Sequence, residues 1–359
     1  MCRGLDFFGI DINPLAILAC EVKSGPLYVK RLREKSKFLL DAIIEDSCSR
    51  IEVQFPDIDK WFNHNVQLEL SAIYRAIRLE PSRWARKVFW LSLSSTVRSV
   101  CNSRSSTYKL HIKSADKIKI GSSALEEFEK KLKKNIENIS DQKNILREKN
   151  ALKVATSKSE VVIKNADTSR LVRSSLKCDL LVSSPPYGDN QTTVTYGQFS
   201  YLPLMWVDLD DIDNLTQKGL LSHKNAIDSM SLGGSKKDSK LKYSAIKERS
   251  ISFVKCVGLI KDINSENVKK LISFIFDLDK ALSNSLVLLR ENAYMIWTLG
   301  NRRISNIEVP LDKIVRELLE FRGCVFVHKL ERDIPSKRMA SRNKTAPTMV
   351  KESILIMRK

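Results

Sequence analysis

One short stretch of the chain combines a hydroxyl group, two prolines and an aromatic ring. It consists of Ser184, Pro185, Pro186 and Tyr187, and it follows the apolar run 180–182. The apolar run predicts a short buried strand, and two prolines without N–H groups end its hydrogen-bonded ladder. Ligands of open α/β sheets bind beyond the carboxyl ends of the strands. These four residues are therefore candidate catalytic residues on a stiff loop.

This set of groups suits chemistry at the exocyclic amino group of a nucleic acid base. Such an amine is a poor nucleophile because its lone pair is delocalised into the ring. The Ser184 hydroxyl and the Pro185 carbonyl can both accept its hydrogen bonds and localise that lone pair, while the Tyr187 ring can stack on a base rotated out of its helix. Catalysis would then rest on positioning and electrostatics. The local alternative is an ordinary proline turn after a strand.

The loop 184–187 resembles the catalytic motif of amino-group DNA methyltransferases, in which Asp, Asn or Ser precedes Pro-Pro-Tyr or Pro-Pro-Phe. The serine form is typical of enzymes that make N4-methylcytosine. The resemblance implies S-adenosylmethionine as cofactor, with Ser184 also in its binding site, and double-stranded DNA as substrate in a restriction-modification system. It implies an α/β fold with a Rossmann-like class I methyltransferase sheet.

An acidic residue near the start of the chain is a second candidate. The run 7–12 predicts a buried strand, which Asn13-Pro14 ends, and Pro14 suits the first turn of a helix. Asp11 lies where nucleotide-binding units carry the carboxylate that accepts hydrogen bonds from ribose hydroxyls. The segment 9–16, Gly-Ile-Asp-Ile-Asn-Pro-Leu-Ala, resembles the matching segment of N4-cytosine methyltransferases. This resemblance implies that Asp11 and Ile12 bind the cofactor.

The third acidic candidate is Asp167. It ends the run 161–167, which reads as a strand, and a helical turn is expected to start near Thr168. The resemblance implies that Asp167 accepts a hydrogen bond from the adenine amino group of the cofactor. The cap of a helix is the local alternative for this aspartate. Asp11, Asp167 and Ser184 follow one another along the chain, each at the end of a predicted strand.

The sequence departs from the family in its glycines. In the family a Phe-x-Gly-x-Gly loop precedes the ribose-binding aspartate, and no Gly-x-Gly occurs in this sequence. We therefore expect an N-terminally truncated sheet that lacks its first strand, glycine loop and first helix. A companion chain that supplies this loop is a candidate partner. A truncated or split subunit that binds DNA without independent activity remains an alternative.

The expected organisation has three parts. Residues 1–30 start the methyltransferase domain with its second strand and helix, and 31–155 form a mainly helical, basic insertion that is a candidate DNA-recognition region. Residues 156–359 complete the domain, with a mobile loop at about 213–250 and a closing antiparallel hairpin at its end.

Basic and hydroxyl residues gather within the insertion. Their mixture with one aromatic ring suits phosphate contacts and stacking, and a solvated basic surface is the alternative. The residues of this run are Arg98, Asn102, Arg104, Ser105, Ser106, Tyr108, Lys109, His111 and Lys113.

The amino-acid composition limits the classes of binding partner and site that we expect. A net charge of +19 with a pI near 9.6 favours a polyanion. The seven scattered cysteines and four histidines form no metal-ligand spacing or disulfide framework, so we expect no metal site and a reducing, cytoplasmic setting. No cysteine follows a proline, which argues against a C5-cytosine methyltransferase. No apolar run is long enough to span a membrane.

Two alternatives share the same chemistry. Methylation of adenine N6 is one, because the Ser, Asp and Asn forms of the loop do not separate the two bases strictly. An RNA or protein methyltransferase is the other, because Asn-Pro-Pro-Tyr loops also serve there. The large basic insertion favours duplex DNA.

Overall fold

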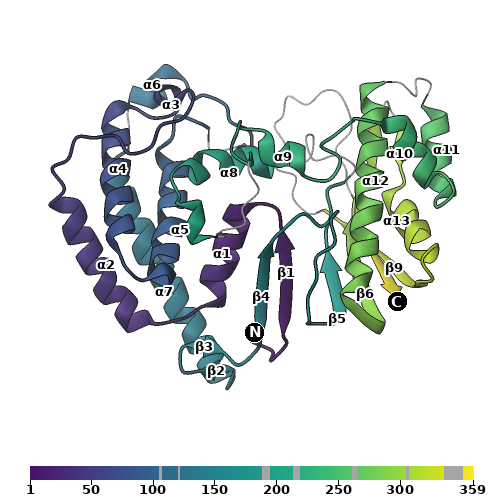
Figure 1. Cartoon of the computed structure of the whole chain (residues 1–359), viewed down its shortest axis with the longest axis horizontal. Helices are drawn as coiled ribbons and strands as arrows, with labels where there is room; N and C mark the ends of the chain where they lie inside the picture. The colour runs from purple at the N-terminus through teal and green to yellow at the C-terminus, as the bar shows by residue number, and fades with distance from the viewer. Residues whose placement is uncertain are drawn as a thin grey trace. The chain divides into compact units, whose positions relative to one another are not determined.

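The computed structural model describes residues 1–104, 107–119, 122–187, 195–212, 219–260, 265–304, 307–334 and 351–359. The structure is mixed α/β, and Figure 1 shows its helices and strands. It divides into two compact units, each built from two stretches of the chain. Unit 1 comprises Met1–Asn165 and Tyr196–Ile227, and unit 2 comprises Ala166–Thr195 and Asp228–Lys359.

The sheet of unit 1 has two parallel strands, β1 (Phe7–Asp11) and β4 (Val161–Asn165). Helix α1 (Pro14–Ser24) follows β1 directly, as predicted. The Asn13 side chain accepts a hydrogen bond from the Leu15 N–H at 3.0 Å, which satisfies one unpaired donor of the helix start. Two neighbouring residues, Asn13 and Pro14, therefore fix the sharp turn from strand to helix.

The rest of unit 1 is largely helical, as expected for region 31–155, and it shares one unit with β1 and β4. Helix α5 is its centre and packs against α1, α4, α7 and α8. Phe89 and Trp90 of α5 are fully buried. The elements are α2 (Val29–Ile44), α3 (Ile58–Trp61), α4 (His64–Leu79), α5 (Arg83–Val100), α6 (Ala115–Lys119), α7 (Ala124–Glu148), β2 (Leu152–Lys153), β3 (Thr156–Ser157), α8 (Tyr196–Met205) and η1 (Leu209–Asp211).

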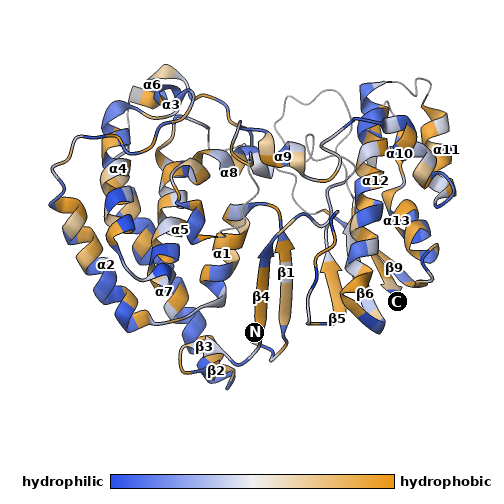
Figure 2. Cartoon of the chain, viewed as in Figure 1, coloured by the Kyte–Doolittle hydropathy of each residue, from blue (hydrophilic) through white to orange (hydrophobic). Residues whose placement is uncertain are grey.

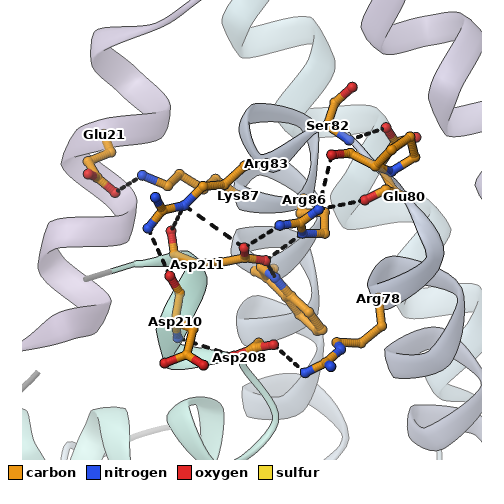
Figure 3. Close-up of polar contacts among 12 residues, drawn as sticks. Glu21, Arg78, Glu80, Ser82, Arg83, Arg86, Lys87, Asp208, Asp210 and Asp211 are labelled. Atoms are coloured by element: carbon orange, nitrogen blue, oxygen red, sulfur yellow. Dashed lines mark hydrogen bonds and ion pairs between the residues drawn. The ribbon is translucent and has the colours of Figure 1, made fainter. Parts of the chain in front are cut away.

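A buried carboxylate joins α5 to η1 (Figure 3). Asp211 is 5% exposed, and its oxygens accept hydrogen bonds from Arg86 Nη2 at 2.6 Å, Arg86 Nε at 2.7 Å and Trp90 Nε1 at 2.7 Å. Arg83 Nε donates to the Asp211 carbonyl at 3.0 Å. Burial acts to raise the pKa of Asp211, but the hydrogen bonds from Arg86 and Trp90 outweigh it and lower that pKa. The segment after α8 is thus held against α5 by the buried Asp211 carboxylate. Moving this carboxylate would break its hydrogen bonds and destabilise the fold.

Unit 2 is built on a four-stranded sheet of order β5-β6-β10-β9. Strand β5 (Cys178–Ser183) runs parallel to β6 (Leu289–Leu299). Strand β10 (Lys351–Arg358) is antiparallel to both β6 and β9 (Val325–Asp333), so the predicted closing hairpin is confirmed. The core lies between this sheet and α11 (Ile251–Leu259), α12 (Glu266–Val287) and α13 (Leu311–Glu320), and a short pair, β7 (Arg302–Ile304) and β8 (Ile307–Val309), packs beside it.

The expectation of a buried strand at 180–182 is only partly met. The strand exists, and Figure 2 shows its apolar colour, but Leu180 and Val182 are 49% and 68% exposed. Within the residues that the structure describes, β5 pairs with β6 alone and β1 pairs with β4 alone. Leu181, which lies between Leu180 and Val182, packs against the core, so these two side chains project from the opposite face of the sheet, and this explains their exposure.

A mobile loop was expected at about 213–250, but the structure contains helices within 219–250. This segment contains α9 (Ala226–Met230) and α10 (Ser239–Ile246), and Ile246 is fully buried. The Gly233 N–H donates to Asp277 Oδ2 on α12 at 2.8 Å. The many lysines conceal the apolar pair Tyr243 and Ile246, whose helical spacing anchors α10 to the core. Residues 213–218 lie outside the described residues.

Two kinds of feature are absent from the described residues. No helix in the described ranges is long and apolar enough to cross a membrane. Within the same ranges, no group of three or more His, Cys, Asp or Glu side chains is placed to hold a metal ion.

Candidate functional site

The Ser-Pro-Pro-Tyr loop leaves the carboxyl end of β5. The ladder between β5 and β6 ends at the pair Ser183 and Trp297, immediately before Ser184. Ser184 is exposed, Pro185 is buried and Tyr187 is half-buried. The loop therefore presents a hydroxyl group from a backbone that its buried proline fixes.

A chain of hydrogen bonds links this loop to the hairpin β9–β10. The Tyr187 hydroxyl donates to Glu352 Oε1 at 2.8 Å, and it lies 3.4 Å from Ser184 Oγ. Glu352 Oε2 accepts a hydrogen bond from Arg332 Nε at 2.8 Å. The β9–β10 register places Glu352 directly opposite Arg332. We call Ser184, Tyr187, Glu352 and Arg332 the hydroxyl relay.

The surroundings keep the Tyr187 phenol protonated. Burial raises the pKa of Tyr187, and the hydrogen bond to the Glu352 carboxylate raises it further, while the contact with Ser184 lowers it. Tyr187 is therefore a hydrogen-bond donor at neutral pH. The sequence did not predict Glu352, because only the register of two strands far along the chain brings it to this loop.

Asp11 lies in unit 1, at the carboxyl end of β1 as predicted. Its Oδ1 accepts a hydrogen bond from the Asn13 N–H at 2.8 Å, and Asn165 Nδ2 donates to the carbonyls of Asp11 and Ile12, each at 3.1 Å. Desolvation raises the pKa of Asp11, and backbone hydrogen bonds from Asn13 and Ile12 oppose this. The carboxylate lies at the end of the strand, where its oxygens can accept further hydrogen bonds.

Asp167 lies in unit 2, so the structure does not group it with Asp11 in one unit. Its Oδ1 accepts a hydrogen bond from the Ser169 N–H at 2.8 Å, and its Oδ2 lies 3.5 Å from Arg170 Nε. Residues 168–169 form a turn where a helical turn was expected. Asp167 therefore stabilises a turn, and within the described residues 168–177 no helix follows that it could cap.

Unit 1 carries a cluster of a cation and three rings, which we call the aromatic cluster. The Arg98 guanidinium lies over the Phe199 ring at 4.5 Å, and the Tyr108 ring is 6.0 Å from Tyr196 and 5.8 Å from Phe199. Tyr108 and Tyr196 are 51% and 60% exposed. The sequence predicted Arg98 and Tyr108, whereas the fold adds the ring pair of α8.

The Arg98 charge is partly withdrawn from water. Burial lowers the pKa of this guanidinium. Its Nη1 is buried and has no hydrogen-bond acceptor in the structure as described. A cation held this way gains from an anion that reaches it, and the two exposed tyrosine rings beside it offer faces for stacking. The surface therefore has the two elements that a nucleic acid strand requires.

The chain is similar in sequence to one kind of known protein. No family model matches this chain, and no solved structure matches it. The chain is 28% identical to the Type II methyltransferase M.MvaI of Kocuria varians over an alignment of 388 residues, which covers 100% of this chain and 80% of that protein. Over its whole length, this chain is therefore similar to a Type II methyltransferase.

Proposed function

We propose that this chain is an S-adenosylmethionine-dependent DNA methyltransferase that methylates the exocyclic N4 of cytosine in duplex DNA, within a restriction-modification system. The observation that carries the proposal is the Ser-Pro-Pro-Tyr loop at the carboxyl end of β5, with the Ser184 hydroxyl exposed. The likeness to M.MvaI supports methyl transfer. The proposed fold is a Rossmann-like class I methyltransferase sheet.

Each residue of the loop has a role in this proposal. The Ser184 hydroxyl and the Pro185 carbonyl accept hydrogen bonds from the cytosine amino group and localise its lone pair on nitrogen. Pro186 limits the motion of the loop, and the Tyr187 ring stacks on the base after rotation out of the duplex. S-adenosylmethionine, when bound, supplies a methyl group activated by a positively charged sulfur. The protein contributes position and electrostatics.

The residues proposed for the cofactor fit the groups of a nucleoside. Asp11 is proposed to accept a hydrogen bond from a ribose hydroxyl at the carboxyl end of β1, and Ile12 follows it in the same turn. Asp167 is proposed to accept a hydrogen bond from the adenine amino group. Because Ser169 and Arg170 already contact Asp167, its role for the cofactor would be the weaker of the two.

The direct test of the function is the product. The purified chain is incubated with duplex DNA and labelled S-adenosylmethionine, and the DNA is digested to nucleosides for mass spectrometry. We expect label in N4-methylcytosine. Label in N6-methyladenine would favour the alternative base, and label in RNA or protein offered in competition would contradict DNA as the substrate.

A DNA-binding subunit that needs a companion chain is the second candidate. The free edges of β1 and β5 in the described structure and the absence of Gly-x-Gly from the sequence favour it. Calorimetry with S-adenosylmethionine, with and without duplex DNA, separates the two candidates. Binding of the cofactor supports the enzyme, whereas DNA binding without cofactor binding supports the subunit.

The aromatic cluster leads to a prediction for DNA binding. We expect Tyr108→Ala to weaken duplex binding on the order of tenfold, because stacking of a base on an aromatic ring contributes about 1–3 kcal/mol. Phe38→Ala is the matched control, since Phe38 is an exposed ring on α2 outside the cluster. Fluorescence anisotropy with a labelled duplex at one fixed salt concentration measures both. Equal affinities of the two variants would contradict a role for the cluster.

A further inference from the structure

A serine at the head of the loop poses a chemical problem. A hydroxyl group both donates and accepts hydrogen bonds, whereas the carboxylate of aspartate only accepts. The proposed reaction requires Ser184 to accept a hydrogen bond from the amino group of the base. The Ser184 proton must therefore point to another acceptor, or the hydroxyl will present a donor to a group that is itself a donor.

The hydroxyl relay supplies that acceptor. Ionised Glu352 has only acceptor oxygens, so the hydrogen bond of 2.8 Å between it and Tyr187 uses the phenolic proton. The Tyr187 oxygen is then left with lone pairs, and Ser184 Oγ lies 3.4 Å from it. This last distance is long for a hydrogen bond between hydroxyls. Hydrogen bonds of catalytic groups are often long without substrate and shorten in the complex.

Arg332 fixes the direction of the relay at its far end. Its Nε donates to Glu352 Oε2 at 2.8 Å, and its Nη2 forms an ion pair with the same oxygen at 2.7 Å. A guanidinium is always charged and only donates, so Glu352 Oε2 can only accept in this pair, and the strand register holds Glu352 opposite Arg332. Each hydrogen bond of the relay then has one direction. Arg332 donates to Glu352, Tyr187 donates to Glu352, and Ser184 donates to Tyr187.

We propose that Glu352, acting through the Tyr187 hydroxyl, draws the proton of Ser184 toward Tyr187 and leaves the lone pairs of Ser184 facing the amino group of the base. Glu352 and Arg332 are positioning residues in this inference, which rests on the proposed function. The ring of Tyr187 serves to stack on the base, and its hydroxyl serves to orient Ser184. The relay thus makes Ser184 a hydrogen-bond acceptor toward the base, as the carboxylate of an aspartate would be by itself.

A double-variant cycle tests the inference. Tyr187→Phe keeps the ring and removes the hydroxyl, and Glu352→Gln replaces the carboxylate by an amide that can also donate. We expect each to lower kcat about tenfold, with KM for DNA unchanged, and the double variant to lose no more than either single one. Glu331→Gln is the control, because Glu331 is an exposed carboxylate on β9 of the same sheet. Full activity of Tyr187→Phe, or losses that multiply, would overturn the inference.

Ser184→Asp supplies a rescue arm, because its carboxylate accepts hydrogen bonds in every orientation. We expect Tyr187→Phe to lower kcat by a smaller factor in the Ser184→Asp variant than in the unaltered chain. An equal cost in both backgrounds would mean that the hydroxyl only positions the ring, and the inference would fall. If the unaltered chain transfers no methyl group at all, the proposed function fails first, and that result is distinct from an active chain that tolerates Tyr187→Phe.

A second measurement does not depend on activity. Carbon NMR of tyrosine labelled at Cζ follows the titration of Tyr187, whose signal is identified by its loss in Tyr187→Phe. Because the hydrogen bond to Glu352 raises the pKa of Tyr187, Glu352→Gln is expected to lower that pKa. An unchanged pKa of Tyr187 in Glu352→Gln would show that Tyr187 and Glu352 are not hydrogen-bonded in solution. The hydroxyl relay would then be contradicted.

Discussion

Replacement of Ser184 by alanine is expected to lower methyl transfer by about 10²–10³-fold, the loss typical of removing one preorganised hydrogen-bonding group from a transition state. The methyl side chain of alanine cannot accept a hydrogen bond from the cytosine amino group, so the nitrogen keeps its lone pair in the ring. Ser184 is exposed and packs against little. Duplex affinity is therefore expected to stay within about twofold, because no buried contact is lost. Single-turnover kinetics, with the protein in excess over DNA, measures the rate of methyl transfer.

The neighbouring serine provides the control for this prediction. Ser183→Ala removes a hydroxyl one residue earlier, within the paired part of β5, and should leave turnover within a factor of about three, since surface changes of this size cost little. Similar losses for Ser183→Ala and Ser184→Ala would indicate a disturbed loop and contradict the assignment of Ser184. Loss of duplex affinity in Ser184→Ala would contradict a purely catalytic role.

The largest expected effect on stability comes from Asp211. We expect Asp211→Ala to lower the free energy of unfolding of unit 1 by about 3–5 kcal/mol, because Arg86 Nε, Arg86 Nη2 and the buried Trp90 N–H lose the carboxylate that accepts their hydrogen bonds. The control is Asp210→Ala, since the Asp210 side chain is exposed and only its carbonyl accepts from Arg83. Urea unfolding followed by tryptophan fluorescence measures both variants. Equal midpoints for the two variants would contradict the network drawn in Figure 3.

The same carboxylate implies a pH dependence with a definite sign. The pKa of Asp211 is lower in the folded chain than the ordinary value of 3.8. Its contribution to stability is therefore fully present above that ordinary value and is lost as pH falls through the lower, folded value. The free energy difference between the unaltered chain and Asp211→Ala should be constant near neutral pH and shrink below about pH 4. A difference that grew on acidification would have the wrong sign.

The elements with local signals were predictable from sequence. Asn13 and Pro14 mark the start of α1 by their chemistry, since one caps the helix and the other lacks the N–H that the first turn leaves unpaired. The sequence predicted a mainly helical region at 31–155, and two prolines marked the end of β5. Each signal operates within a few residues, so no knowledge of the fold was required.

The features that depend on distant pairing were not predictable. Glu352 contacts Tyr187 only because β10 pairs with β6 and β9 in one register, and no local pattern sets that register. Tyr196 and Phe199 approach Tyr108 only because α8 lies beside the end of α5, which no local pattern sets. Leu180 and Val182 were predicted to be buried, because an apolar run does not show whether both faces of the sheet are covered.

The position of β10 has a consequence for how unit 2 assembles. This strand follows β6 and β9 in the chain but lies between them in the sheet. During synthesis β9 therefore has no partner, and the inner residues Leu355 and Met357, which end fully or almost fully buried, arrive after the helices that cover them. A nascent chain carries an open apolar edge on β6 for this interval, which makes it a substrate for chaperones and proteases. The yield of folded protein should thus depend more on temperature and chaperone supply than on the final stability of unit 2.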